Sequence, residues 1–279
     1  MKLLLFVAFF AVCNSVHGQW EEKKEEPPEE AKEMAKESET HAQILEVSET
    51  NAKYTFKFPE VNVVDFLSFS DLKTLNAEIL TSVFGESIYI NGKEERVAAL
   101  SAKEILEHLK LETYKTNGMG TVGCDYEVLC NHNQVLSIRF TVNFMGAYPS
   151  VHAVYASFSL TQGERRRRIS LYDICKDNDA KSSIYDMIHL KMKERGRQRI
   201  KELNLQDTQI IEALRNPPQP NRDRELDFIV TDAGIIFYSP FGFPHVMLAA
   251  EPNPEYLFSW AELKDKLNQS SVVRYFFEK

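Results

Sequence analysis

The sequence predicts an α+β fold: an antiparallel sheet of hairpins with about three helices packed on one face. Two observations predict this class. Segments with alternating apolar residues follow one another in pairs and are separated by turn sequences, which is typical of β-hairpins. Helical periodicity is confined to a few separate stretches and does not alternate with single strands, as βαβ units would require. With 279 residues, the chain is long enough for a sizeable core in one domain or two small ones.

Residues 1–18 have the features of a secretory signal peptide. A short apolar run, Leu3 to Val12, is followed by small residues at Val16 and Gly18, so we expect cleavage before Gln19. The run is too short to span a bilayer, and no later run reaches the roughly 18 apolar residues that a membrane helix needs. The sequence therefore predicts a secreted, extracellular protein without a membrane span.

Residues 19–52 are expected to form a solvated, acidic, low-complexity arm. The stretch "EEKKEEPPEEAKEMAKESET" is dense in Glu and Lys and offers too little apolar area to offset the entropy of ordering it. The Pro27-Pro28 pair interrupts a helix, and residues 29–47 are expected to be a charged, partly helical spacer. The formal net charge of −8 argues against general nucleic-acid binding, which needs a basic surface.

The folded part is expected to begin near Lys53, and residues 53–145 form its first half. Alternation in "KYTFKFPEV" places Tyr54, Phe56 and Phe58 on one face of a strand. A helix capped by Ser70 follows, with apolar side chains at helical spacing, namely Leu72, Leu75, Ile79, Leu80 and Val83.

Three further features complete this half. Asn91-Gly92 is a strong hairpin-turn signal. Ser101 and Glu104 stand in capping-box order at the start of a second helix. Two strands are then expected around a turn at Asn131-His132-Asn133.

Residues 146–279 form the second half. Two strands are expected around Gln162-Gly163-Glu164, and a third helix runs through "SSIYDMIHLKMKERGRQRIKELN" until "NPPQPNRD" breaks it. A hairpin turning at Asp232-Ala233-Gly234 follows, and "EYLFSWAELKDKL" predicts a last strand and a short helix.

Three cysteines remain after removal of the signal peptide, and an odd number predicts one disulfide and one thiol in an oxidising compartment. Cys124 and Cys130 are the candidate pair, although Cys175 could pair with either of them or with another chain. Asn268 lies in the sequon Asn-Gln-Ser and is a candidate glycosylation site.

No catalytic, cofactor-binding or metal-binding residues are expected. "GMGTVG" has the letters of a dinucleotide-binding loop, but a helix precedes it and a strand follows, which is the reverse of what phosphate binding requires. The spacing of Cys124, Cys130 and His132 fits no zinc knuckle. Asp173, Asp177 and Asp179 lack the turn glycine of a calcium loop and are expected to cap the next helix.

The second half resembles the DUF3298 family, which occurs together with DUF4163. The similar segments are Gly146-Ala147-Tyr148-Pro149, "FSLTQG" from Phe158, "ISLYDI" from Ile169, and the block "FIVTDAGIIFYSPFGFPHVMLAAEPNPEYLFSWAEL". Residues 53–145 resemble the partner domain DUF4163. Tyr148 stands where the family usually has histidine. Related domains are found in extracellular parts of bacterial anti-sigma factors, one of which binds lysozyme, so the resemblance implies a non-catalytic ligand-binding or matrix module.

The arginine run Arg165, Arg166, Arg167 and Arg168 has three interpretations. The resemblance places it after a turn, at the start of a strand on which Ile169 and Leu171 share one face. Arg165 and Arg167 then fall on the core side near the turn, where their stems can reach water. The alternatives are a patch that binds an anion or partner, and a protease cleavage site before Ile169.

We therefore expect a secreted, non-enzymatic extracellular protein that binds a ligand or belongs to a matrix. One version of this hypothesis is a component of a mineralised matrix. Its partner would be an extracellular protein or polysaccharide, and the oligomeric state stays open. One alternative is a protein that binds or inhibits lysozyme or a related glycan hydrolase. The other is a carbohydrate-active enzyme, which would need paired carboxylates that the sequence does not indicate.

Overall fold

The structure, a computed structural model, describes residues 41–50, 54–64, 67–90, 92–115, 120–162, 167–223 and 225–277. It confirms the α+β class. The hairpins are distributed over a five-stranded, a three-stranded and a two-stranded sheet, so the predicted helices do not all cover one face of a single sheet. The predicted signal peptide, residues 1–18, and the first part of the predicted arm, residues 19–40, lie outside the described residues.

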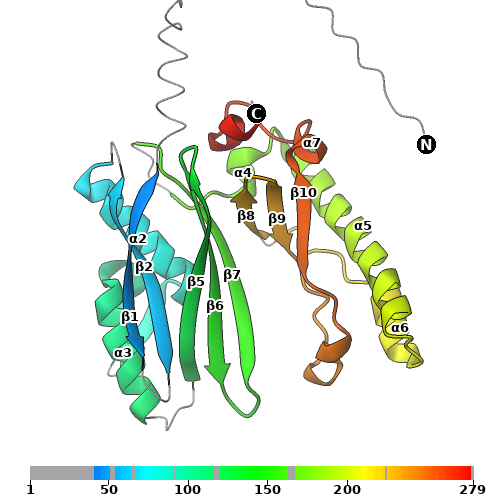
Figure 1. Ribbon diagram of the computed structural model, residues 1–279, viewed down its shortest axis with the longest axis horizontal. Coiled ribbons are helices and arrows are strands. Elements are labelled where there is room, and N and C mark those ends of the chain that lie inside the picture. Colours follow the sequence, from blue (N-terminus) through cyan, green and yellow to red (C-terminus); the bar gives the residue numbers. More distant parts are fainter. Residues whose placement is uncertain are drawn as a thin grey trace, which may run out of the picture.

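The larger sheet has the strand order β1-β2-β5-β6-β7 and lies in the left half of Figure 1. All neighbouring strands in it are antiparallel except β2 and β5, which are parallel. Its strands are β1 (Ala42–Thr50), β2 (Thr55–Val64), β5 (Gly120–His132), β6 (Val135–Met145) and β7 (Ser150–Ser159).

Strand β1 corrects the predicted start of the folded part. Residues 42–50 pair with β2 along its whole length, so the ordered sheet includes residues that were assigned to the acidic arm. Ala42 is buried and Ile44 and Val47 are partly buried, whereas most of the intervening residues are exposed. The sequence signal is weak because Glu46 and Glu49 interrupt the apolar residues of a strand at the margin of the sheet, so no clear alternation is visible.

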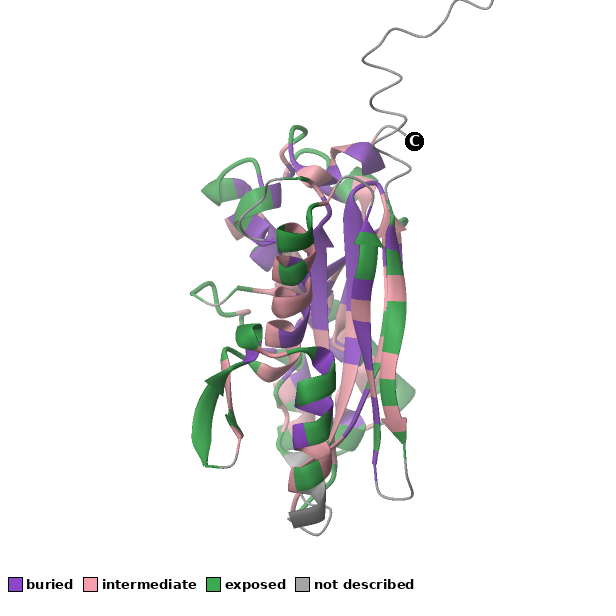
Figure 2. Ribbon diagram, turned by 90° about the vertical axis from the view of Figure 1, so that its left-hand side faces the viewer, coloured by how far each residue is buried: buried purple, intermediate pink, exposed green. Residues whose placement is uncertain are grey.

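Two helices cover one face of this sheet. They are α2 (Phe69–Phe84) and α3 (Ala102–Lys115), and they enclose a core with the buried face of β2. The predicted aromatic face is confirmed: the rings of Tyr54 and Phe56 lie 5.3 Å apart, and those of Phe56 and Phe58 lie 6.5 Å apart. Figure 2, which looks from the α2–α3 side, shows exposed residues on these helices and buried residues on the strands behind them.

The helix starts follow local capping chemistry. Helix α2 begins two residues before the predicted cap, because Ser68 and Asp71 form the capping box instead of Ser70. The box at α3 is confirmed, since Ser101 N–H donates to Glu104 at 2.7 Å and Glu104 N–H donates to Ser101 Oγ at 3.3 Å.

The predicted hairpins form with small shifts. The short strands β3 (Ser87–Ile90) and β4 (Lys93–Arg96) pair around the Asn91-Gly92 turn. The β5–β6 turn lies at Asn133 and Gln134, slightly later than predicted, and both residues have positive φ angles of 53° and 60°. This is the geometry of a two-residue type I′ hairpin turn.

The smaller sheet has the order β10-β9-β8 and packs beside β7 on the other side of the molecule from α2 and α3 (Figure 1). Its strands are β8 (Asp227–Thr231), β9 (Gly234–Tyr238) and β10 (Glu255–Ser259), followed by the short helix α7 (Trp260–Leu263). The predicted turn of the β8–β9 hairpin is confirmed.

Helix α5 (Asn178–Glu202) covers this smaller sheet and encloses a second core. Asp177 caps it, as predicted, by accepting a hydrogen bond from Ala180 N–H at 2.6 Å. The sequence did not predict α6 (Thr208–Arg215), which packs closely on α5: a Cβ at Gly196 would come within 2.0 Å of Leu214 O. The remaining short elements are η1 (Val97–Ala99), α4 (Leu171–Ile174), η2 (His245–Ala250) and η3 (Val272–Phe276).

Basic side chains of α5 cover the outer edge of β10. Lys191 donates to Leu257 O at 2.7 Å, and Arg195 donates to Glu255 O at 2.5 Å. One turn further, Arg199 donates to Ala249 O at 3.0 Å, in the segment before β10. Spacing of four residues aligns these cations on one side of the helix, where they bind carbonyls that a free sheet edge would leave unpaired.

Candidate functional site

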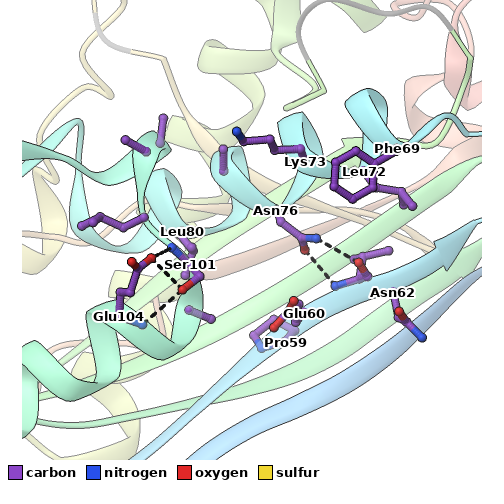
Figure 3. Close-up of a pocket in the computed structure, with 16 residues that line it drawn as sticks. Pro59, Glu60, Asn62, Phe69, Leu72, Lys73, Asn76, Leu80, Ser101 and Glu104 are labelled. Atoms are coloured by element: carbon purple, nitrogen blue, oxygen red, sulfur yellow. Dashed lines mark hydrogen bonds between the residues drawn. The ribbon is translucent and has the colours of Figure 1, made fainter.

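The strongest candidate site lies beside the part of β2 that has no neighbouring strand on its β5 side. This strand pairs with β1 along its length but with β5 only at Thr55 and Phe56. Further along, the side chain of Asn76, on α2, replaces a neighbouring strand. Val61 N–H donates to Asn76 Oδ1 at 2.8 Å, and Asn76 Nδ2 donates to Val61 O at 2.9 Å (Figure 3).

The same edge is closed to a further strand. The direction of the backbone hydrogen-bonding groups alternates along a strand, so the backbone groups of Pro59 point to the same side of β2 as those of Val61. Pro59 has no N–H to offer, and both backbone groups of Val61 are occupied by Asn76. A ligand at this edge would therefore contact side chains, because Pro59 and Val61 offer it no unpaired backbone N–H groups.

A groove of about 530 Å³ runs along this edge between β2 and α2. Its volume falls within the range of small-ligand and side-chain pockets, about 300–1,000 Å³. Figure 3 shows Ser101 and Glu104 at one end and Phe69 at the other. The groove is lined by Pro59, Glu60, Val61, Asn62, Phe69, Leu72, Lys73, Asn76, Ala77, Leu80, Ala98, Ala99, Leu100, Ser101, Ala102 and Glu104.

Several polar groups of the groove already have partners within the protein. Asn76 is bound to Val61, and Ser101 and Glu104 bind each other. Hydrogen bonds from the backbone N–H and hydroxyl of Ser101 hold the pKa of Glu104 below its usual value, so this carboxylate is ionised at neutral pH. The surface left for a ligand includes apolar side chains such as Leu72 and Phe69, and Phe69 is 85% exposed at one end.

Arg167 and Arg168, the described part of the arginine run, connect the segment after β7 to α2 and to the smaller sheet. Arg167 is completely buried and forms an ion pair with Asp71 in the first turn of α2. Its backbone N–H donates to Glu78 Oε2 at 2.9 Å. The next side chain, Arg168, points to the other sheet and pairs with Asp227 of β8 at 3.0 Å.

This arrangement confirms that the segment after the turn pairs with β7, but it corrects two details. The predicted strand through Ile169 and Leu171 is wrong, because the pairing is an isolated bridge at Arg168 and α4 begins at Leu171. Residues 167–169 pair antiparallel with the end of β7, where Ile169 N–H donates to Ser157 O at 2.7 Å. Arg167 was expected to reach water from the core side, but its charge is neutralised inside the protein. Arg165 and Arg166 lie outside the described residues, so an anion-binding patch on them stays a prediction.

The predicted disulfide between Cys124 and Cys130 is wrong in this structure. Both residues lie on the extended strand β5, six positions apart, which separates their Cα atoms by about 20 Å. A disulfide needs less than about 7 Å. Cys124 is buried in the core under α2 and α3, whereas Cys130 and Cys175 belong to the other core, and none of the three is disulfide-bonded.

Asn268 lies in a turn shortly after α7. Its Oδ1 accepts hydrogen bonds from Ser270 N–H at 3.0 Å and Ser270 Oγ at 2.7 Å, and Gln269 and Ser270 are exposed. Glycosylation of Asn268 stays a prediction.

The two sheets also meet in a polar cluster that the sequence did not indicate. Glu255 of β10 accepts from Arg139 at 3.0 Å and from the hydroxyl of Tyr155 at 2.5 Å. Arg139 also pairs with Glu127, and the ring of Tyr155 stacks on Tyr238 at 4.9 Å. Burial, followed by the hydrogen bond to Glu255, raises the pKa of Tyr155. The contacts of Glu255 with Arg139 and Tyr155 connect residues 116 and 100 positions apart, which no local pattern could have revealed.

No cluster of three or more His, Cys, Asp or Glu side chains in the described part of the chain is arranged to hold a metal ion. None of the described helices is both long enough and apolar enough to cross a membrane.

Comparison with solved structures places the fold in a known class. The chain is similar to a member of the DUF3298 family from Bacteroides fragilis, with a TM-score of 0.51 and 18% sequence identity, over 86% of this chain and 98% of that one. A DUF3298 family protein from Pseudomonas aeruginosa has a TM-score of 0.48 and 10% identity, over 82% of this chain and 94% of that one. The first similarity confirms that the predicted resemblance holds for the fold.

Comparisons by sequence gave no such relative. No family model matches the chain, and no curated protein matches it.

Proposed function

We propose that the protein is a secreted, non-enzymatic extracellular binding or matrix protein that uses the groove between β2 and α2 as its ligand site. One observation carries the proposal. The groove has a volume of about 530 Å³, and polar side chains that line it are already bound within the protein. Because Asn76, Ser101 and Glu104 are already bound and the lining also offers apolar surface, the groove suits a ligand that buries apolar side chains.

The groove favours an apolar protein segment over other extracellular ligands. Strand addition is disfavoured by Pro59 and by the Asn76–Val61 hydrogen bonds. An anionic ligand would meet the carboxylates of Glu60 and Glu104, against a single cation, Lys73. The ligand class is therefore an extracellular protein that presents exposed apolar residues.

The composition supports a matrix setting. The chain has a formal net charge of −8, and the stretch before β1 is rich in glutamate. Such a charge keeps a protein soluble and attracts cations or basic partners over a range set by salt. In a mineralised matrix, the same carboxylates would bind mineral cations.

Expression of the full chain in secreting cells tests this function. We expect the protein in the medium and in the extracted matrix, with its mature N-terminus at Gln19 by mass spectrometry. Phe69→Ser and Ala98→Trp alter the groove at exposed positions and should reduce retention in the matrix. Tyr89→Ser changes another exposed aromatic residue, which lies outside the groove, and should leave retention unchanged. Detection only inside cells would contradict the proposal.

A further inference from the structure

The hairpin tip between β6 and β7, residues 144–151, is uncharged and apolar. Charged residues make up 27% of the chain, yet none occurs from Phe140 to Gly163. The tip exposes apolar side chains, with Tyr148 67% and Val151 66% exposed and Phe144 and Met145 exposed to a smaller extent. Single exposed apolar residues are ordinary, but several on one hairpin tip form a patch typical of an interaction site.

The tip is supported by its own turn. A Cβ at Gly146 would come within 3.1 Å of the Phe144 ring, so this ring lies against the turn. The hairpin stands at one end of the larger sheet (Figure 1). The tip is thus a projecting apolar surface, whereas the groove beside β2 is a concave one.

The tip and the groove of one molecule are far apart. Thr55 and Asn143 both pair with Gly123, so they lie at the same level of the sheet. From this level, Val61 of the groove is six residues along β2, about 20 Å away. Strand β6 runs in the opposite direction and carries the tip away from the groove. A single copy therefore does not fill its own groove with its own tip.

We propose that the hairpin tip of one copy docks into the groove of a second copy. This inference rests on the proposed function, since it names the ligand of the same groove. The two surfaces match in kind, because an uncharged apolar projection meets a groove with apolar surface in which Asn76, Ser101 and Glu104 are already hydrogen-bonded within the protein. After pairing, one copy still has its groove unused and the other still has its tip unused, so the contact is heterologous and extends into open chains of molecules. Such chains are what a matrix component needs.

The composition of the two copies predicts how the association depends on salt. A contact of one hairpin tip with one groove is expected to bury less than the roughly 1,200 Å² of stable interfaces, so the association should be weak and concentration-dependent. No ion pair with the tip can be screened, because the tip carries no charge. The copies repel each other through their net charge of −8, and salt screens this repulsion. Association should therefore strengthen when salt is added.

Analytical ultracentrifugation of the purified full-length mature chain tests the proposal. We expect the average mass of the wild type to rise with concentration and with salt. Tyr148→Ser in the tip and Ala98→Trp in the groove should each weaken association at least about tenfold. Tyr89→Ser is the matched control, because Tyr89 and Tyr148 are both 67% exposed, and it should associate like the wild type.

A mixing experiment makes the test specific. A Tyr148→Ser copy keeps an intact groove, and an Ala98→Trp copy keeps an intact tip. Each should be monomeric alone, whereas the mixture should give one-to-one pairs and nothing larger. Association that survives either substitution would overturn the proposal, as would a wild type that is monomeric at every concentration and salt. Crosslinks from residues 19–40 to the groove of a monomer would identify that segment as the occupant and would also overturn it.

The two proposals can fail independently. Retention in the matrix and secretion are measured in cells, whereas self-association is measured on purified protein. A secreted protein that loses matrix retention in groove variants but never self-associates keeps the proposed function and loses this inference. A protein that self-associates as described but is found only inside cells keeps this inference and loses the proposed function.

Discussion

Arg167 and Asp71 form an ion pair that connects the segment after β7 to the first turn of α2, and the guanidinium is completely buried. Removing one partner of a buried pair leaves the other charge uncompensated. We predict that Arg167→Ala lowers the free energy of unfolding by about 3–5 kcal/mol, measured by urea denaturation.

Arg168→Ala is the control for this prediction. Its side chain is about one-third exposed and pairs with the half-exposed Asp227, so its loss should cost about 1 kcal/mol or less. Equal losses for the two variants would show that burial of Arg167 contributes no stability beyond that of a surface arginine.

The capping boxes predict a loss of stability in acid. Hydrogen bonds from Ser101 to Glu104, and from Ser68 to Asp71, hold the pKa values of both carboxyl groups below their usual values of 4.5 and 3.8. A group with a lowered pKa in the folded state stabilises the protein above its unfolded pKa, and this contribution is lost as the pH falls through the folded pKa. Stability should therefore decline below about pH 4.5.

Glu104→Gln isolates one of these carboxylates. Thermal unfolding followed from about pH 6 to about pH 2 should show a lower midpoint than the wild type near neutral pH, and the two midpoints should converge in acid. Glu95→Gln, at an exposed position in β4, should follow the wild type at every pH. A constant difference between Glu104→Gln and the wild type would contradict the assignment.

The buried cysteines predict slow reaction with thiol reagents. Burial raises the pKa of Cys124 to about 12 and that of Cys175 to about 11, so almost no reactive thiolate is present at mildly alkaline pH. The folded mature chain should resist alkylation by iodoacetamide, and the unfolded chain should be modified at Cys124, Cys130 and Cys175. An intact mass lower by two hydrogens, with one thiol modified, would show a disulfide instead.

Local patterns were sufficient for most of the helices and hairpins. The Ser101–Glu104 box, the Asn91-Gly92 turn and the aromatic face of β2 depend on residues close together in the chain, so their physical causes are visible in the sequence. The same holds for Asp177, which caps α5 from three residues away.

The features that were missed or misplaced depend on pairing between distant residues. Strand β1 is stabilised by β2, although its own composition is that of an acidic arm. Burial of Arg167 follows from Asp71, nearly a hundred residues earlier in the chain. The groove exists because α2, η1 and the start of α3 meet beside β2, and no short segment contains that information.

Asn76 occupies the backbone groups of Val61 at the edge of β2 that has no neighbouring strand. Asn76→Ala removes both hydrogen bonds to Val61 and leaves a partly buried N–H and C=O without their partner. The free energy of unfolding should fall by about 1–3 kcal/mol. The exposed edge should also promote association through strand pairing, seen as increased thioflavin binding on prolonged incubation.

Asn62→Ala is the matched control, because Asn62 lines the same groove but is exposed, and it should change neither quantity. If Asn76→Ala also changed neither, the side chain would not be what closes this edge.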